Sequence, residues 1–110
     1  MASRKVGVAG NRIELEGRLV NGPEVRVTPA GTPVIRFIVD CSMPGEELKL
    51  GVVMAGDSAL AAKEILRAGR QVKVSGRLRA LKVGTKSIRT DAGFEVIADS
   101  VEQDSETGTS

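Results

Sequence analysis

Apolar and polar residues alternate along most of the chain, and this two-residue period is typical of half-buried β-strands. The period is clearest over residues 12–20, where Ile13, Leu15 and Leu19 fall on one face and charged residues fall on the other. The run breaks at residues 21–23 and resumes over 24–28. We therefore interpret the two runs as pieces of one long bent strand.

The same period predicts four further strands, over residues 33–41, 48–55, 71–81 and 94–101. Residues 59–68 are instead rich in good helix formers and predict one short helix between the third and fourth strands. Asp57 or Ser58 suits the N-cap of this helix, and Gly69 suits its C-terminal end.

Four residues on the apolar faces of these strands have particular roles. Gly17 and Gly76 each replace a side chain on a buried face, which indicates a bend or bulge of the kind that a barrel needs. Phe37 shares its face with Ile35 and Val39, so we expect it in the core. Cys41 falls in the same register and is interpreted as a small core residue.

Five strands with one helix between the third and fourth is the element order of an OB-fold barrel. The sequence therefore predicts an all-β fold, with a split barrel of other topology or an SH3-like barrel as alternatives. We expect a flexible arm over residues 1–10, the OB-fold domain over 11–101, and a disordered acidic tail over 102–110.

Composition argues against catalysis and against a bound metal or cofactor. The chain of 110 residues has no His and a single Cys, so it lacks the commonest general base and the commonest zinc ligand. Its carboxylates form no recognisable paired motif. No apolar run is long enough to span a membrane, and no secretory signal is recognisable, so the expected location is cytoplasmic.

The net charge of +2 conceals two blocks of opposite sign. Residues 70–89 contain seven basic residues and no acid, whereas residues 91–110 contain six acids and no base. Two solvated faces that balance each other, or a strand edge kept soluble by cations, would explain this layout without a ligand. A continuous cationic strand and loop favours nucleic-acid binding instead.

The candidate binding residues centre on the fourth strand and the loop that follows it. Arg77 and Arg79 are two residues apart and project from the same face, and Lys73 extends that row. Such a row, continued into a loop containing glycine, suits a phosphate backbone. Phe94 could stack on a base or close the end of the barrel. The full predicted set is Arg18, Arg26, Arg36, Lys73, Arg77, Arg79, Lys82, Lys86, Arg89 and Phe94.

Three segments carry a resemblance to bacterial single-stranded DNA-binding proteins. Residues 11–19 resemble the opening strand of that family, residues 23–33 followed by Phe37 resemble its first hairpin, and Gly69 with residues 72–78 resembles its fourth strand. The similarity covers roughly residues 11–101. The short tail lacks the family's long linker and acidic tip, so the chain looks more like the primosomal replication protein N family.

This resemblance implies a homodimer that binds single-stranded DNA and helps to reload the replicative helicase at stalled forks. It places Arg26, Lys82 and Arg89 on basic positions of the family. Two departures from the pattern concern the loops: Glu46 and Glu47 stand where base-stacking aromatic residues are expected, and Gly84 replaces a position that is often basic.

The predicted function is therefore a single-stranded DNA-binding component of replication restart. Its predicted partners are single-stranded DNA, other replication proteins and a second copy of the chain. We expect the second copy, a dimer, because the apolar strand faces that carry Val34 and Ile38 would otherwise be exposed to solvent. An OB-fold module for protein assembly and an RNA-binding OB protein are the alternatives, because tracking of the backbone does not distinguish RNA from DNA.

Overall fold

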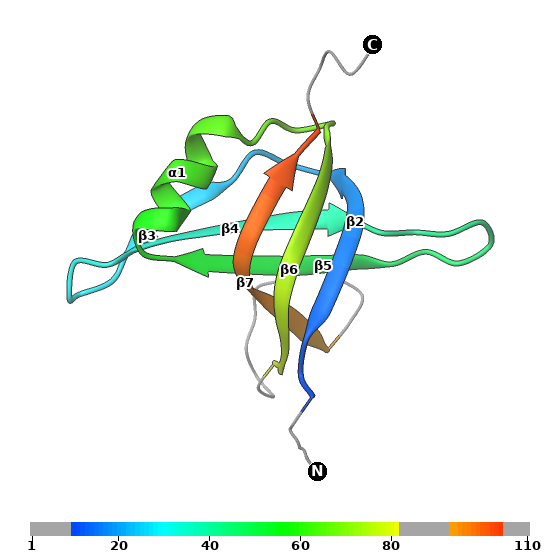
Figure 1. Cartoon of the computed structure of the whole chain (residues 1–110), viewed down its shortest axis with the longest axis horizontal. Helices are drawn as coiled ribbons and strands as arrows, with labels where there is room; N and C mark the ends of the chain where they lie inside the picture. The colour runs from blue at the N-terminus through cyan, green and yellow to red at the C-terminus, as the bar shows by residue number, and fades with distance from the viewer. Residues whose placement is uncertain (1–9, 82–92, 105–110) are drawn as a thin grey trace.

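The computed structural model describes residues 10–81 and 93–104 and shows a β-barrel with one short helix (Figure 1). The first strand is present as two pieces, β2 and β3. The elements are β2 (Ile13–Leu19), β3 (Glu24–Val27), β4 (Pro33–Asp40), β5 (Lys49–Ala55), α1 (Asp57–Ile65), β6 (Gln71–Ala80) and β7 (Phe94–Gln103).

The strands close into a ring in the order β2–β6–β7–β5–β4, and pairing between β2 and β4 closes it. The strand β3 also pairs with β4, so β2 and β3 follow one another along the same neighbour and act as one bent strand, as expected. The pair β5–β7 is parallel, and the others are antiparallel. This arrangement, with α1 between β5 and β6, confirms the predicted OB-fold barrel.

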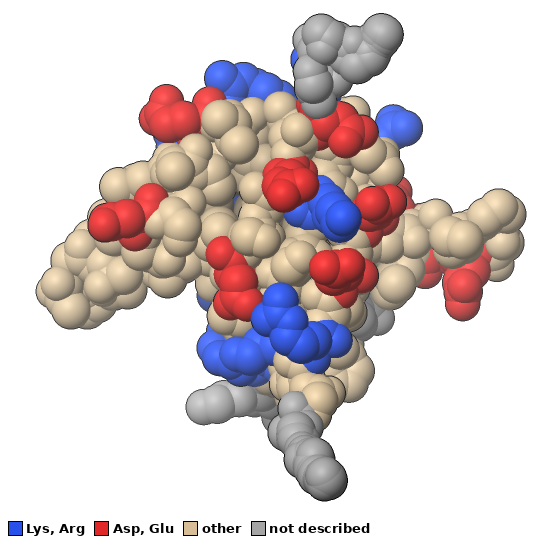
Figure 2. Space-filling view, viewed as in Figure 1, with Lys and Arg blue, Asp and Glu red and all other residues tan. Residues whose placement is uncertain are grey.

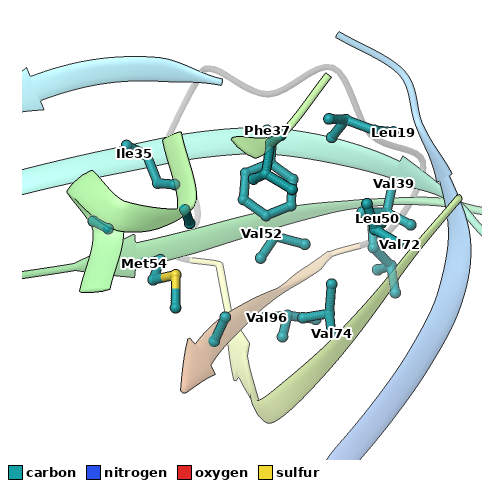
Figure 3. Close-up of a cluster of buried hydrophobic side chains, with 14 residues drawn as sticks. Leu19, Ile35, Phe37, Val39, Leu50, Val52, Met54, Val72, Val74 and Val96 are labelled. Carbon is teal, nitrogen blue, oxygen red and sulfur yellow. The ribbon is translucent and has the colours of Figure 1, made fainter. Parts of the chain in front are cut away.

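The core fills the barrel with side chains from the alternating positions of every long strand (Figure 3). Phe37 is 2% exposed and lies among aliphatic side chains, which confirms its predicted place. Cys41 is half-buried and packs against the core from its edge. Burial and then the charge of Asp40 raise the pKa of the Cys41 thiol, so this residue is a poor nucleophile at neutral pH.

Two glycines let strands approach more closely than any side chain would allow. A Cβ on Gly17 would lie 2.8 Å from Cγ1 of Val39 and closer still to the carbonyl oxygen of Asp40. A Cβ on Gly76 would lie 2.9 Å from Cα of Ala98 and closer still to the carbonyl oxygen of Ile97. At Gly76 the pairing with β7 also shifts register, so this glycine sits at the predicted bulge.

The helix differs from its predicted limits at both ends. It begins at Asp57 after Gly56, whose φ of 90° accounts for the turn, and no side chain caps it. It ends at Ile65 because Leu66 adopts an extended backbone and is only 2% exposed in the core. Gly69 lies in the following turn, where its N–H donates to the carbonyl of Leu19 at 2.8 Å.

The last strand is longer than predicted, because β7 continues through Gln103 rather than ending at Val101. Gln103 pairs with Val72 and Glu102 pairs with Lys73, so the first two residues assigned to the tail belong to the sheet. Across residues 10–81 and 93–104, no helix is long and apolar enough to cross a membrane.

Candidate nucleic-acid interface

The outer surface of β4, β5, β7 and β6 carries arginines on both sides of an apolar strip. Strand register defines two rows across it, because paired residues of a sheet point to the same face. The first row is Arg36, Val53, Ile97 and Arg77, and the second is Ile38, Gly51, Glu95 and Arg79. We call this surface, defined by these eight residues, the arginine face.

The apolar side chains of this strip are largely buried, although they lie on the outer surface of the barrel. Val53 is 9% exposed, and Ile38 and Ile97 are half-buried. On β3, Arg26 pairs with Val34 and lies diagonally from Arg36, whose own partner on β3 is Glu24. Arg26, Arg36, Arg77 and Arg79, all predicted from the sequence, are exposed on the outer surface of the barrel.

Glu95 lies in the middle of the arginine face and is only 4% exposed. Arg79 donates to its Oε2 from both Nε, at 3.1 Å, and Nη2. Nη1 of Arg36 lies 4.0 Å from its Oε1. The neighbour of Glu95 on β5 is Gly51, which has no side chain, so the carboxylate has room between the two arginines. Charges need such pairing when they are buried.

This carboxylate changes the electrostatics of the face. With three arginines and one carboxylate among its eight residues, the arginine face has a formal net charge of +2. Arg79 and Arg36 share the negative charge of Glu95, whereas Arg77 has no ion-pair partner within residues 10–81 and 93–104. Arg77 is therefore the arginine of this face whose charge is fully available to a ligand.

Lys73 lies at an exposed position on the same face of β6 as Arg77 and Arg79, as expected, but its neighbours on both adjacent strands are acidic. It pairs with Glu16 of β2 on one side and with Glu102 of β7 on the other, so acids flank it on the same face. Figure 2 shows the result: basic side chains gather at the lower end of the face formed by β2, β6 and β7, and acidic side chains surround the basic ones in its middle.

Arg18 also lies apart from the arginine face. It lies near the C-terminal end of β2, where it pairs with Gln71 of β6 and with Asp40 of β4. Hydrogen bonds from Ser42 lower the pKa of Asp40, and the positive charges of Lys49 and Arg18 lower it further. The positive charge of Arg18 is thus partly balanced within the protein.

Three predicted cations, Lys82, Lys86 and Arg89, lie outside the described residues and stay predictions. Phe94 begins β7 opposite Ala80 and is 50% exposed, so it is not a full member of the core. Its side chain is accessible at the end of the barrel from which the segment 82–92 departs.

The hairpin between β4 and β5 projects from the barrel but offers no cationic surface at its tip (Figure 1). Its turn joins Met43 and Glu46, which bridge through backbone hydrogen bonds of 2.9 and 2.8 Å. Met43 is 63% exposed, and Glu47 forms an ion pair of 3.2 Å with Lys49. The charged residues of this turn are therefore acidic, whereas the arginine face has a positive net charge.

Sequence reasoning missed Glu95 and the apolar strip as parts of the site. It placed Glu95 in an acidic block separate from the basic strand, although antiparallel pairing of the last two strands brings the blocks together. The outward positions of Val53 and Ile97 were visible as apolar residues on both faces of their strands. That pattern is a usable signal for an outer face that is covered or binds a ligand.

A closed five-stranded barrel with one helix and a cationic outer face defines the class of OB-fold binding proteins. The sequence matches the model of the single-strand binding protein family over residues 10–104, and the chain belongs to this family. It is also similar to a single-stranded DNA-binding protein of Corynebacterium glutamicum, with 32% identity over 108 residues. That match covers 87% of this chain and 48% of the relative, so the chain spans about half the length of the curated relative it matches.

Proposed function

We propose that this chain binds single-stranded DNA on the arginine face. The observation that carries the proposal is the row in which the apolar Val53 and Ile97 lie between Arg36 and Arg77, with Ile38 two residues from Arg36 on β4. Exposed bases of a single strand can cover an apolar strip, while guanidinium groups at its edges meet the phosphates. The family membership of the chain and the name of its Corynebacterium relative support the same ligand.

The experiment is a fluorescence-anisotropy titration with labelled oligo-dT, oligo-U and a DNA duplex of equal length, at two salt concentrations. We expect oligo-dT to bind more tightly than the duplex, whose bases are stacked on each other and cannot cover the strip. Four to six neutralised phosphates would give a slope of log K against log salt of roughly −3 to −4. Preference for duplex would contradict the proposal, and stronger binding of oligo-U would favour the RNA-binding alternative.

A role in replication restart is the finer part of the proposal. It is supported by the resemblance of residues 11–101 to primosomal replication protein N. We expect the chain to increase loading of a replicative helicase onto a forked DNA that carries a single-stranded gap. Equal loading with and without the chain would leave DNA binding intact as a function and remove the restart role.

We also propose that the chain forms a homodimer. Val34 and Ile38 are half-buried, so they give weaker support than the sequence indicated. Stronger support comes from β2, because residues 13–17 pair with β6 on one side and with no other strand among residues 10–81 and 93–104. An unpaired strand edge invites another strand. Light scattering should give twice the chain mass of 11.5 kDa, and a monomer mass at every concentration would contradict the dimer.

A further inference from the structure

Flat side chains for base stacking are scarce on this protein. The chain has two Phe, no Trp and no Tyr, and Phe37 is buried in the core. Among the described residues, Phe94 is thus the one aromatic side chain that a base could reach, at one end of the barrel. Proteins that bind single strands usually stack several bases on aromatic rings, and the guanidinium group of Arg can serve the same purpose.

Arg79 presents such a flat group in a fixed orientation. Its Nε and Nη2 both donate to Oε2 of Glu95, and these donors lie in the plane of the guanidinium group. The side chain of Glu95 is 6% exposed, whereas that of Arg79 is 49% exposed. A carboxylate embedded in the surface therefore holds one edge of the guanidinium group and leaves its flat faces without hydrogen bonds.

The same contact makes Arg79 a weaker partner for phosphate. Part of its charge is balanced by Glu95, and two of its five N–H groups are already engaged. Because the side chain is already held, a base that stacks on it does not have to immobilise it first. The apolar side chains of Ile97 and Val53 in the adjacent row add surface for the sugar and the base.

Arg77 offers the opposite case two residues away. It points to the same face of β6, pairs with the apolar Ile97, and has no ion-pair partner among the residues that the structure describes. A guanidinium group with an unbalanced charge suits a phosphate contact, which requires charge but no fixed plane. The two arginines therefore form a matched pair with the same side chain, strand and face.

Resting on the proposed function, we propose that Arg79, held edge-on by Glu95, is a stacking platform for a base of the bound single strand, whereas Arg77 contacts phosphate. Lys keeps the charge of Arg but lacks its plane. Arg79→Lys should therefore remove stacking and leave phosphate attraction in place, whereas Arg77→Lys should affect strands with and without bases equally.

The test measures binding of the unmodified chain, R79K and R77K to oligo-dT and to an abasic oligonucleotide of equal length. Stacking of a base is typically worth about 1–3 kcal/mol, so R79K should bind oligo-dT about 5- to 150-fold more weakly. Its affinity for the abasic strand should change less than about twofold, because no base is present to stack. R77K should change the affinities for the two ligands by the same factor, because both strands keep the phosphate that Arg77 contacts.

The outcomes separate this inference from the function on which it rests. If the unmodified chain binds neither strand, the proposed function fails. If it binds oligo-dT but R79K weakens both ligands equally, or neither, Arg79 is no stacking platform and the proposed function stands. Circular dichroism and thermal melting confirm that each variant is folded before its affinity is compared.

A second variant, Glu95→Gln, tests the role of the carboxylate without altering any arginine. Gln can still accept a hydrogen bond from Arg79, but the contact loses its charge assistance, so it holds the guanidinium group less firmly and leaves its charge unbalanced. We expect weaker discrimination between oligo-dT and the abasic strand, and a salt slope steeper by about 0.7 for each additional phosphate that is neutralised. An unchanged discrimination and an unchanged slope would overturn the proposed role of Glu95.

Discussion

Replacing Gly76 with Ala is expected to lower the free energy of unfolding by about 3 kcal/mol or more, the upper range for forcing extra atoms into a packed site. The added methyl group would lie 2.9 Å from Cα of Ala98 and would overlap the carbonyl oxygen of Ile97. These are backbone atoms of the neighbouring strand, so no side-chain rotation relieves the overlap. The β6–β7 pairing must open at its bulge, and that pairing also positions Arg79 and Glu95.

Urea denaturation followed by circular dichroism measures this loss, with Gly22→Ala as the control. A Cβ on Gly22 would meet no atom within 4 Å, and its backbone is not left-handed. The control should therefore stay within about 0.5 kcal/mol of the unmodified chain. A Gly76→Ala protein with the stability of the control would mean that the close approach of β6 and β7 does not constrain the fold.

Replacing Arg36, Arg77 and Arg79 together with Gln is expected to weaken binding of oligo-dT by roughly 100-fold at low salt, because two phosphates are no longer neutralised and one stacking platform is removed. The salt slope should become shallower by about 1.4, or about 0.7 for each of these phosphates. All three side chains are on the outer surface, and Arg36 and Arg79 are close to half exposed. Because Arg36 and Arg79 are also the ion-pair partners of the buried Glu95, circular dichroism and thermal melting must show that the triple variant is folded before its affinity is compared.

The matched control replaces Lys63, Arg67 and Lys73 with Gln and removes the same net charge. Lys63 is on α1 and Arg67 follows it, whereas Lys73 lies on β6 between Glu16 and Glu102. This control should lose much less affinity, because none of its three cations is on the arginine face. Equal losses in the two triple variants would show that net charge alone, and no defined surface, attracts the DNA.

The alternation of apolar residues predicted much of this fold because burial on one face of a strand is a local property of the sequence. It placed Phe37 in the core and predicted a bend or bulge at Gly17 and Gly76, and the structure shows a register shift at Gly76. The predicted end of the helix was wrong because Leu66 leaves the helix and packs into the core. Helix propensity does not take such tertiary packing into account. The bend of the first strand was visible in its break at residues 21–23.

The candidate site was only partly predictable, because it depends on which residues face each other across strands. Residues 81–93 separate β6 from β7, so no short turn fixes their register in the sequence. That register places Glu95 beside Arg79 and Glu102 beside Lys73, so acidic neighbours balance part of the positive charge of these two residues. Arg77 lies opposite the apolar Ile97, and no neighbour on β7 balances its charge. Arg77 and Arg79 were correctly expected to project from the same face of β6.

The most direct test of the central claim is a map of amide chemical-shift changes in ¹⁵N-labelled protein as oligo-dT is added. If the arginine face binds the strand, the largest changes fall on β4, β5, β6 and β7 at Arg36, Val53, Ile97, Arg77 and Arg79, and α1 changes little. Changes concentrated on α1 or on the hairpin around Met43, with the arginine face unaffected, would contradict the account.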